Sequence, residues 1–196
     1  MRVSKAQAQA NREHIVEKAS ELFRECGFDG VGVADLMAAA GFTHGGFYKH
    51  FASKADLMAE ASACSLSKSL AGAASLDVPG FIDAYVTRDH RDARGGGCTM
   101  AALCGDAARQ SEDVKATFAE GIERILQTLG EKYPTAPDAA AGEGRKKMLD
   151  LLSRAVGAIV LSRACPDDSV LADEILEVCR AEMFASLAAD TVDSVP

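Results

Sequence analysis

The stretch from Gly27 to Leu57, GFDGVGVADLMAAAGFTHGGFYKHFASKADL, decides the fold. Its pattern predicts two short helices, over residues 33–40 and 44–51. Between them lies the turn Gly41-Phe42-Thr43, where the glycine suits a helix C-terminus and the threonine suits the N-cap of the next helix. Two short helices joined by so tight a turn are typical of a helix-turn-helix, whose second helix enters the major groove of DNA.

The rest of the chain reads as further helices joined by short breaks rich in Gly or Pro, with no convincing strand. Ser53 is expected to cap a long helix over residues 54–74, with Asp56 in its first turn. A polar loop is expected over 88–97 and a loose segment over 134–144. The other expected helices cover residues 8–26, 80–87, 98–110, 112–133, 145–164 and 169–187. The prediction is an all-α protein of about nine helices, with a three-helix DNA-binding domain over 1–54 and a helical body over 55–196.

Charge is distributed unevenly along the 196 residues, whose formal net charge is −8. Residues 1–54 carry seven Lys or Arg and six Asp or Glu, whereas residues 55–196 carry fourteen and twenty-three. The acidic excess therefore lies in the C-terminal body. Because the N-terminal part is nearly balanced, DNA contact would come from a few placed residues in a dimer and not from a cationic sheath.

Composition places the chain among soluble globular proteins, with 48% hydrophobic and 26% charged residues. No apolar run approaches the roughly 18 residues of a membrane span, and the N-terminus does not resemble a signal peptide, so we expect a cytoplasmic protein. The six cysteines contain no CxxC pair, and the four histidines do not fall at ligand spacing around them. We expect reduced thiols, no metal site and no cofactor.

The quoted stretch resembles the DNA-binding domain of the tetracycline-repressor (TetR) family. The residues that carry the resemblance are Ala40-Gly41-Phe42-Thr43 for the turn, Gly46-Phe47-Tyr48-Lys49-His50-Phe51 for the recognition helix, and Ser53-Lys54 with Leu57 for the next helix. Departures are Val31-Gly32, where the family usually has a hydroxyl cap, and His44, where Lys or Arg is frequent. The pair Gly45-Gly46 also weakens the recognition helix, by about 1 kcal/mol per glycine relative to alanine.

This resemblance implies a repressor that binds a palindromic operator as a homodimer and is released by a small-molecule effector. Phe47 and Phe51 are expected in the core. The residues implied to contact DNA are Thr43, His44, Gly45, Gly46, Tyr48, Lys49, His50 and Lys54. It also places the dimer interface on the last two long helices, which carry apolar stripes at Leu149, Leu152, Val156, Ile159 and Val160, and at Leu171, Ile175, Val178 and Met183.

The central helices hold apolar and aromatic residues that either line an effector pocket or form plain core. They are Phe81, Tyr85, Cys98, Met100, Phe118, Ile122 and Leu126. Cys98 follows three glycines and should stand at a helix N-terminus, which lowers the pKa of a thiol. A sensor of oxidants or electrophiles is therefore an alternative to a small buried residue at a tight helix start.

Two rival functions remain open from the sequence. An enzyme is disfavoured because nucleophile, base and metal ligands do not cluster, and His90-Arg91-Asp92 lacks the other parts of a kinase catalytic loop. A loop salt bridge, or packing against the DNA-binding domain, is the better interpretation of that tripeptide. The same rival class includes a ligand-binding helical protein without specific DNA binding. The second rival keeps the DNA-binding domain but makes the protein an activator or a redox switch through Cys98.

Overall fold

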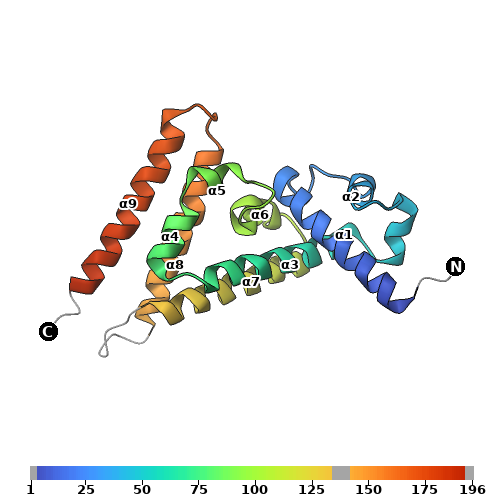
Figure 1. The fold of residues 1–196 in the computed structure, drawn as a ribbon, viewed down its shortest axis with the longest axis horizontal. Coiled ribbons are helices and arrows are strands. Elements are labelled where there is room, and N and C mark those ends of the chain that lie inside the picture. The colour runs from blue at the N-terminus through green and yellow to red at the C-terminus, as the bar shows by residue number, and fades with distance from the viewer. Residues whose placement is uncertain (1–3, 134–141, 193–196) are drawn as a thin grey trace. The chain divides into compact units, whose positions relative to one another are not determined.

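The computed structural model describes residues 4–133 and 142–192, with side chains described up to residue 189. Within these ranges the chain is all-helical and has no strand (Figure 1). The elements are α1 Lys5–Cys26, α2 Val33–Ala39, the 3-10 helix η1 His44–Lys49, α3 Lys54–Ala74, α4 Val78–Tyr85, α5 Arg88–Asp92, α6 Thr99–Ala107, α7 Glu112–Lys132, α8 Glu143–Arg163 and α9 Val170–Val192. The predicted fold class is confirmed.

The capping signals explain several helix ends. Ser53 Oγ accepts the Asp56 N–H at 3.1 Å, and the Asp56 carboxylate accepts the Ala52 N–H at 3.1 Å, so α3 begins where expected. Helix α1 begins three residues earlier than expected, because Ser4 Oγ accepts the Gln7 N–H. Most of the expected loose segment, residues 134–141, lies outside the described residues.

One element differs in kind from its prediction. Residues 88–92 form helix α5, where the polar composition predicted a loop. Thr87 caps this helix by accepting the His90 N–H at 3.1 Å. The other reason is tertiary: Arg91 points inward and is 1% exposed, so contacts distant in sequence hold a segment that lacks any apolar periodicity.

Two compact units make up the described chain. The first unit comprises described residues of 1–69 and 94–121, and the second comprises those of 70–93 and 122–196. Helices α3 and α7 each contribute residues to both. The core of the first unit includes α6 and the start of α7 in addition to the helix-turn-helix. Its largest buried side chains are Ile15, Phe23, Phe28, Leu36, Met37, Phe47, Phe51, Leu57, Leu103 and Phe118.

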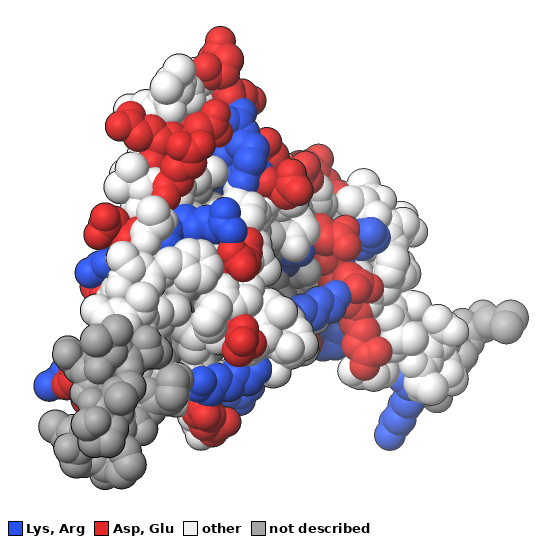
Figure 2. All heavy atoms as spheres, turned by 60° about the vertical axis from the view of Figure 1, so that its left-hand side comes forward, with Lys and Arg blue, Asp and Glu red and all other residues white. Residues whose placement is uncertain are grey.

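The second unit is built around the packed pair α8 and α9 (Figure 1). Buried residues on their facing sides include Leu152, Ile159, Ala172, Leu176 and Met183. Acidic side chains gather at the turn between the two helices (Figure 2). No helix among the described residues is long and apolar enough to cross a membrane.

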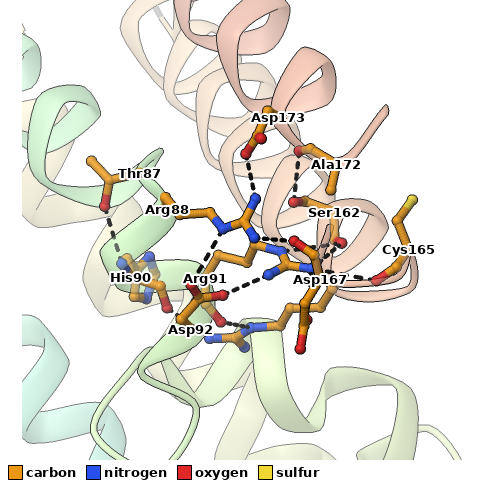
Figure 3. A network of polar contacts seen from close by, with 11 residues as sticks. Thr87, Arg88, His90, Arg91, Asp92, Ser162, Cys165, Asp167, Ala172 and Asp173 are labelled. Carbon is orange, nitrogen blue, oxygen red and sulfur yellow. Dashed lines mark hydrogen bonds and ion pairs between the residues drawn. The ribbon is translucent and has the colours of Figure 1, made fainter. Parts of the chain in front are cut away.

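Arg91 is the centre of a polar network in the second unit (Figure 3). Its guanidinium donates to the carbonyls of Ser162 and Cys165 at 3.2 and 3.3 Å and pairs with the carboxylates of Asp92 and Asp167 at 2.6 and 3.2 Å. These bonds satisfy a charge that would otherwise be costly to bury. They tie α5 to the end of α8 and confirm the salt-bridge interpretation of His90-Arg91-Asp92.

Candidate nucleic-acid interface

The turn between α2 and η1 has the geometry that its sequence predicts. Gly41 has φ +78°, a left-handed conformation that side chains disfavour. The Phe42 N–H donates to the Met37 carbonyl at 2.8 Å, which closes the Schellman pattern of a helix C-terminus. Thr43 follows with extended backbone, but its hydroxyl makes no capping bond to η1. The threonine side chain is exposed and therefore available to a ligand.

Helix η1 is anchored to the core of the first unit by buried aromatic side chains. It is a six-residue 3-10 helix that ends at Lys49, where a short helix to Phe51 was expected, because Gly45 and Gly46 make a regular α-helix costly. Phe47 and Phe51 are 1% and 2% exposed, with ring centroids 5.5 Å apart, so the prediction that they are core is confirmed. These two rings fix the element to the first unit.

The opposite side of η1 is exposed and polar. Tyr48 is 71% exposed, an unusual state for so large a side chain, and its ring meets the edge of Phe47 at 5.2 Å. His44 and Lys49 are exposed as well. Hydroxyl, imidazole and ammonium groups on one short element can donate hydrogen bonds to phosphate or to base edges. These residues are among those predicted to contact DNA, and that contact stays a prediction.

His50 is partly covered by neighbouring rings. Its ring lies 6.3 Å from Phe42 and 6.2 Å from Phe51, so the imidazole is half-buried beside the turn. Arg12 of α1 places its guanidinium 4.5 Å from the centre of the Phe51 ring and pairs with Glu60 of α3 at 2.5 Å. These contacts brace η1 against α1 and α3.

Lys54 has a bonding partner that its sequence position does not predict. Its Nζ donates to the carbonyl oxygen of Phe28 at 2.6 Å. An ammonium group has three donors, so two remain for phosphate. The lysine therefore connects the first residue of α3 to the segment that follows α1.

Sequence reasoning missed two charged residues that join α6 to this segment. Asp106 Oδ2 on α6 accepts the Phe28 N–H at 2.9 Å. Arg24 on α1 donates to the Gly95 carbonyl at 2.7 Å and to the Ser65 hydroxyl. All three contacts join residues more than forty positions apart, and neither Asp106 nor Arg24 stands in a recognisable motif, so no local signal could have identified them.

The residues predicted to line an effector pocket are buried, apart from the half-buried Ile122. Phe118 packs edge-on to Phe28 at 6.5 Å, which makes it a core residue of the first unit. In the second unit the Phe81 and Tyr85 rings lie 5.1 Å apart on α4. Burial suits a pocket wall and a closed core equally, so the pocket stays a prediction.

Cys98 is the N-cap residue of α6, as predicted for a helix start, and it is 6% exposed. Burial, together with the neighbouring Cys98, raises the pKa of Cys104 to about 11. Cys104 is therefore a weak nucleophile at neutral pH. Among the described residues, no group of three or more His, Cys, Asp or Glu side chains is arranged to hold a metal ion.

Comparison with known proteins assigns this segment. The model of the bacterial regulatory proteins of the tetR family matches residues 15–61. The chain is 39% identical to the HTH-type transcriptional regulator AcrR of Shigella flexneri over 59 residues, which are 30% of this chain and 27% of AcrR. It is 49% identical to the HTH-type transcriptional repressor DhaR of Mycobacterium sp. (strain GP1) over 43 residues, 22% of each chain. The matches thus span about a quarter of the curated relatives.

Structural comparison covers much more of the chain. The crystal structure of the reduced form of Escherichia coli NemR matches 89% of this chain and 95% of that one, with a TM-score of 0.72 and 21% identity. That likeness concerns the fold. The turn geometry, the exposed side of η1 and the family match agree: residues 15–61 form a helix-turn-helix segment that matches the bacterial regulatory proteins of the tetR family.

Proposed function

We propose that the protein is a transcriptional repressor that binds a palindromic operator as a homodimer and leaves it when a small-molecule effector binds. One observation carries the proposal: η1 exposes donor side chains, Tyr48 foremost at 71% exposure, on an element fixed from behind by buried Phe47 and Phe51. Such an element can enter a DNA groove while its buried phenylalanines stay packed in the core. The relative DhaR is a transcriptional repressor, which favours repression over activation.

In this proposal the exposed residues have separate roles. Thr43, His44, Gly45 and Gly46 open the element and face bases or adjacent phosphates, since glycine lets the backbone approach the duplex closely. Tyr48, Lys49, His50 and Lys54 donate to phosphates and fix the register on the duplex. Residues 1–54 act as the DNA-binding domain and residues 55–196 as the body, although the first compact unit extends beyond residue 54.

Exposed apolar side chains on α8 and α9 support dimerisation. They are Leu149, Val160 and Leu161 on α8, and Val170, Leu171 and Val178 on α9, all between 42% and 82% exposed. Leu152, Ile159 and Met183, which the stripes had included, are core residues of the protomer. Two helices from each copy would form a four-helix bundle that covers the exposed residues. Sedimentation should give twice the chain mass, and Val178→Asp should shift the equilibrium toward monomer.

Effector release completes the proposal. A ligand bound among the buried residues of the central helices would favour a body whose two recognition elements no longer match the operator spacing. The resulting coupling free energy is typically about 1–3 kcal/mol, a loss of up to about 150-fold in affinity. The effector remains defined only as a small molecule.

The decisive experiment is selection of binding sites from random duplex DNA, followed by gel shift with competitor on the selected site and on the DNA upstream of the protein's own gene. A palindromic site bound by the wild-type protein is expected. Lys49→Ala should weaken binding and reduce the salt dependence by about one phosphate contact. Lys115 is an exposed lysine on α7, so Lys115→Ala is the matched control and should bind DNA as the wild type does. Failure to enrich any sequence would refute specific DNA binding.

A redox switch through Cys98 is the second candidate function, and one observation favours it. Cys98 stands at the N-terminus of α6, where the free backbone N–H groups of the first turn carry partial positive charge. The thiolate would attack a peroxide oxygen, breaking the O–O bond and releasing hydroxide, which leaves sulfenic acid. Loss of operator binding on peroxide treatment, absent in Cys98→Ala, would establish this switch; unchanged binding would exclude it.

A further inference from the structure

The backbone around Phe28 is held from two sides by charged side chains. Asp106 Oδ2 of α6 accepts the Phe28 N–H at 2.9 Å, and Lys54 Nζ of α3 donates to the Phe28 carbonyl at 2.6 Å. Hydrogen bonds to ionised partners are about twice as strong as neutral ones. Two successive peptide groups, between α1 and the loop to α2, are thus fixed by residues 26 and 78 positions away.

The fit between Asp106 and the end of α1 depends on Gly27. This glycine has φ +78°, and a Cβ added there would lie 2.7 Å from Asp106 Oδ2. The carboxylate therefore occupies space that any other residue type would fill. Its second oxygen accepts from Arg109 at 2.8 Å, which orients the carboxylate from just beyond the C-terminus of α6.

The other end of α6 is also tied to α1. Arg24 donates to the carbonyl of Gly95, just before α6, and to the hydroxyl of Ser65. Ser65 in turn hydrogen-bonds Thr99, the first residue of α6. Between the two ties, Leu103 packs in the same core as the helix-turn-helix. A nine-residue helix held at both ends and in the middle cannot shift without changing these bonds.

We propose that Asp106 is a positioning residue for operator binding: its bond to Phe28 sets the place of the Lys54 ammonium at the DNA-facing start of α3, and displacement of α6 breaks that bond. This inference rests on the proposed function, and it supplies a route for effector release. Cys98 and Met100, both predicted to line the effector pocket, belong to the cap and first turn of α6. A ligand that moves these residues would move Asp106, and with it the Phe28–Lys54 connection.

The test compares three variants on the operator selected by the wild-type protein. Asp106→Ala removes the acceptor, whereas Asp106→Asn keeps an oxygen that can accept the Phe28 N–H. Arg109→Ala removes the other partner of Asp106 and leaves the Phe28 bond. We expect Asp106→Ala to bind the operator about tenfold more weakly, the magnitude of a lost charged hydrogen bond, and to exchange the Phe28 amide hydrogen faster. The Asn and Arg109 variants should retain most affinity.

A structural role alone would not reproduce one further readout. Asp106→Ala should flatten the salt dependence of operator affinity by about one phosphate contact, as Lys54→Met does, and the double variant should be no weaker than Lys54→Met alone. Wild-type affinity in Asp106→Ala, or an additive double variant with an unchanged salt slope, would overturn the inference while leaving the proposed function intact. A wild-type protein that selects no DNA sequence would refute the proposed function itself.

Discussion

Helix η1 and the Arg91 network place charged and polar side chains in opposite ways. Around Arg91, 1% exposed, backbone carbonyls and carboxylates satisfy the guanidinium from α5, α8 and the turn that follows it (Figure 3). On η1, Tyr48 and Lys49 project outward from a short 3-10 helix with two glycines. The polar groups around Arg91 are bonded to one another and stabilise the fold. The polar groups on η1 are exposed and remain available to a ligand. Changes at the two sites should therefore affect different observables.

The largest expected effect is on stability. Arg91→Ala would remove a buried donor from the carbonyls of Ser162 and Cys165 and from two carboxylates, and it should lower the free energy of unfolding by about 3 kcal/mol. Urea denaturation measures this change. Arg154→Ala is the matched control, because it breaks only an exposed pair with Asp150, typically worth about 0.3–0.5 kcal/mol. Similar midpoints for both variants would show that the network contributes no more than a surface pair.

Tyr48→Ala should separate binding from stability. Its exposed side chain supports no core contact beyond the edge of Phe47, so the unfolding free energy should change by less than about 0.5 kcal/mol. Operator affinity should fall about tenfold with loss of the hydroxyl and the ring, measured by fluorescence anisotropy. A stability loss comparable to that of Arg91→Ala would contradict the division between the two regions.

Gly45→Ala sharpens the comparison from the other direction. A Cβ at this position meets no atom within 4 Å, and alanine is a better helix former than glycine by about 1 kcal/mol. The variant should be more stable by up to about 1 kcal/mol in thermal unfolding. If its backbone then approaches the duplex less closely, operator affinity should fall although the fold is firmer. Lower stability would show that η1 needs its glycine for backbone conformation.

The smallest expected effect concerns pH. Burial lowers the pKa of His90, the contact with the Tyr85 carbonyl opposes this, and Arg163 adds to it. The folded protein thus disfavours the imidazolium, so stability present above the ordinary pKa is lost as the pH falls through the lowered one. The melting temperature should be lower at pH 5.5 than at 7.5, and His90→Gln should reduce this dependence. An equal slope in the variant would assign the dependence to other groups.

Local signals predicted the helix-turn-helix well because its determinants are local. Gly41 ends α2, Ser53 caps α3, and the two phenylalanines lie on one side of η1. From the pair Gly45-Gly46 the sequence predicted that this helix is weak, but it did not predict that the helix is of the 3-10 type. Helix α5 was missed because Arg91 holds it through residues some seventy positions away. The same reason explains why Asp106 and Arg24 could not be predicted.

The apolar stripes show a second limit. Periodicity places Leu152 and Val160 on one helix with equal weight, yet the first is 5% exposed and the second 44%. Only the packing of α8 on α9 distinguishes the side that is buried in the protein core from the side that is exposed. A hydrophobic pattern predicts that one side of a helix is buried. Which other element covers that side depends on the tertiary fold.

The open space around Gly45 also bears on how such a regulator diverges. A residue that can acquire a side chain without meeting neighbouring atoms is a position where sequence drift leaves the fold intact. Duplicated copies of the gene could then acquire different target sites through single substitutions near the start of η1. Each such substitution would leave the protein folded. If η1 contacts DNA as proposed, the open space at Gly45 would let new contacts arise without a prior stabilising mutation.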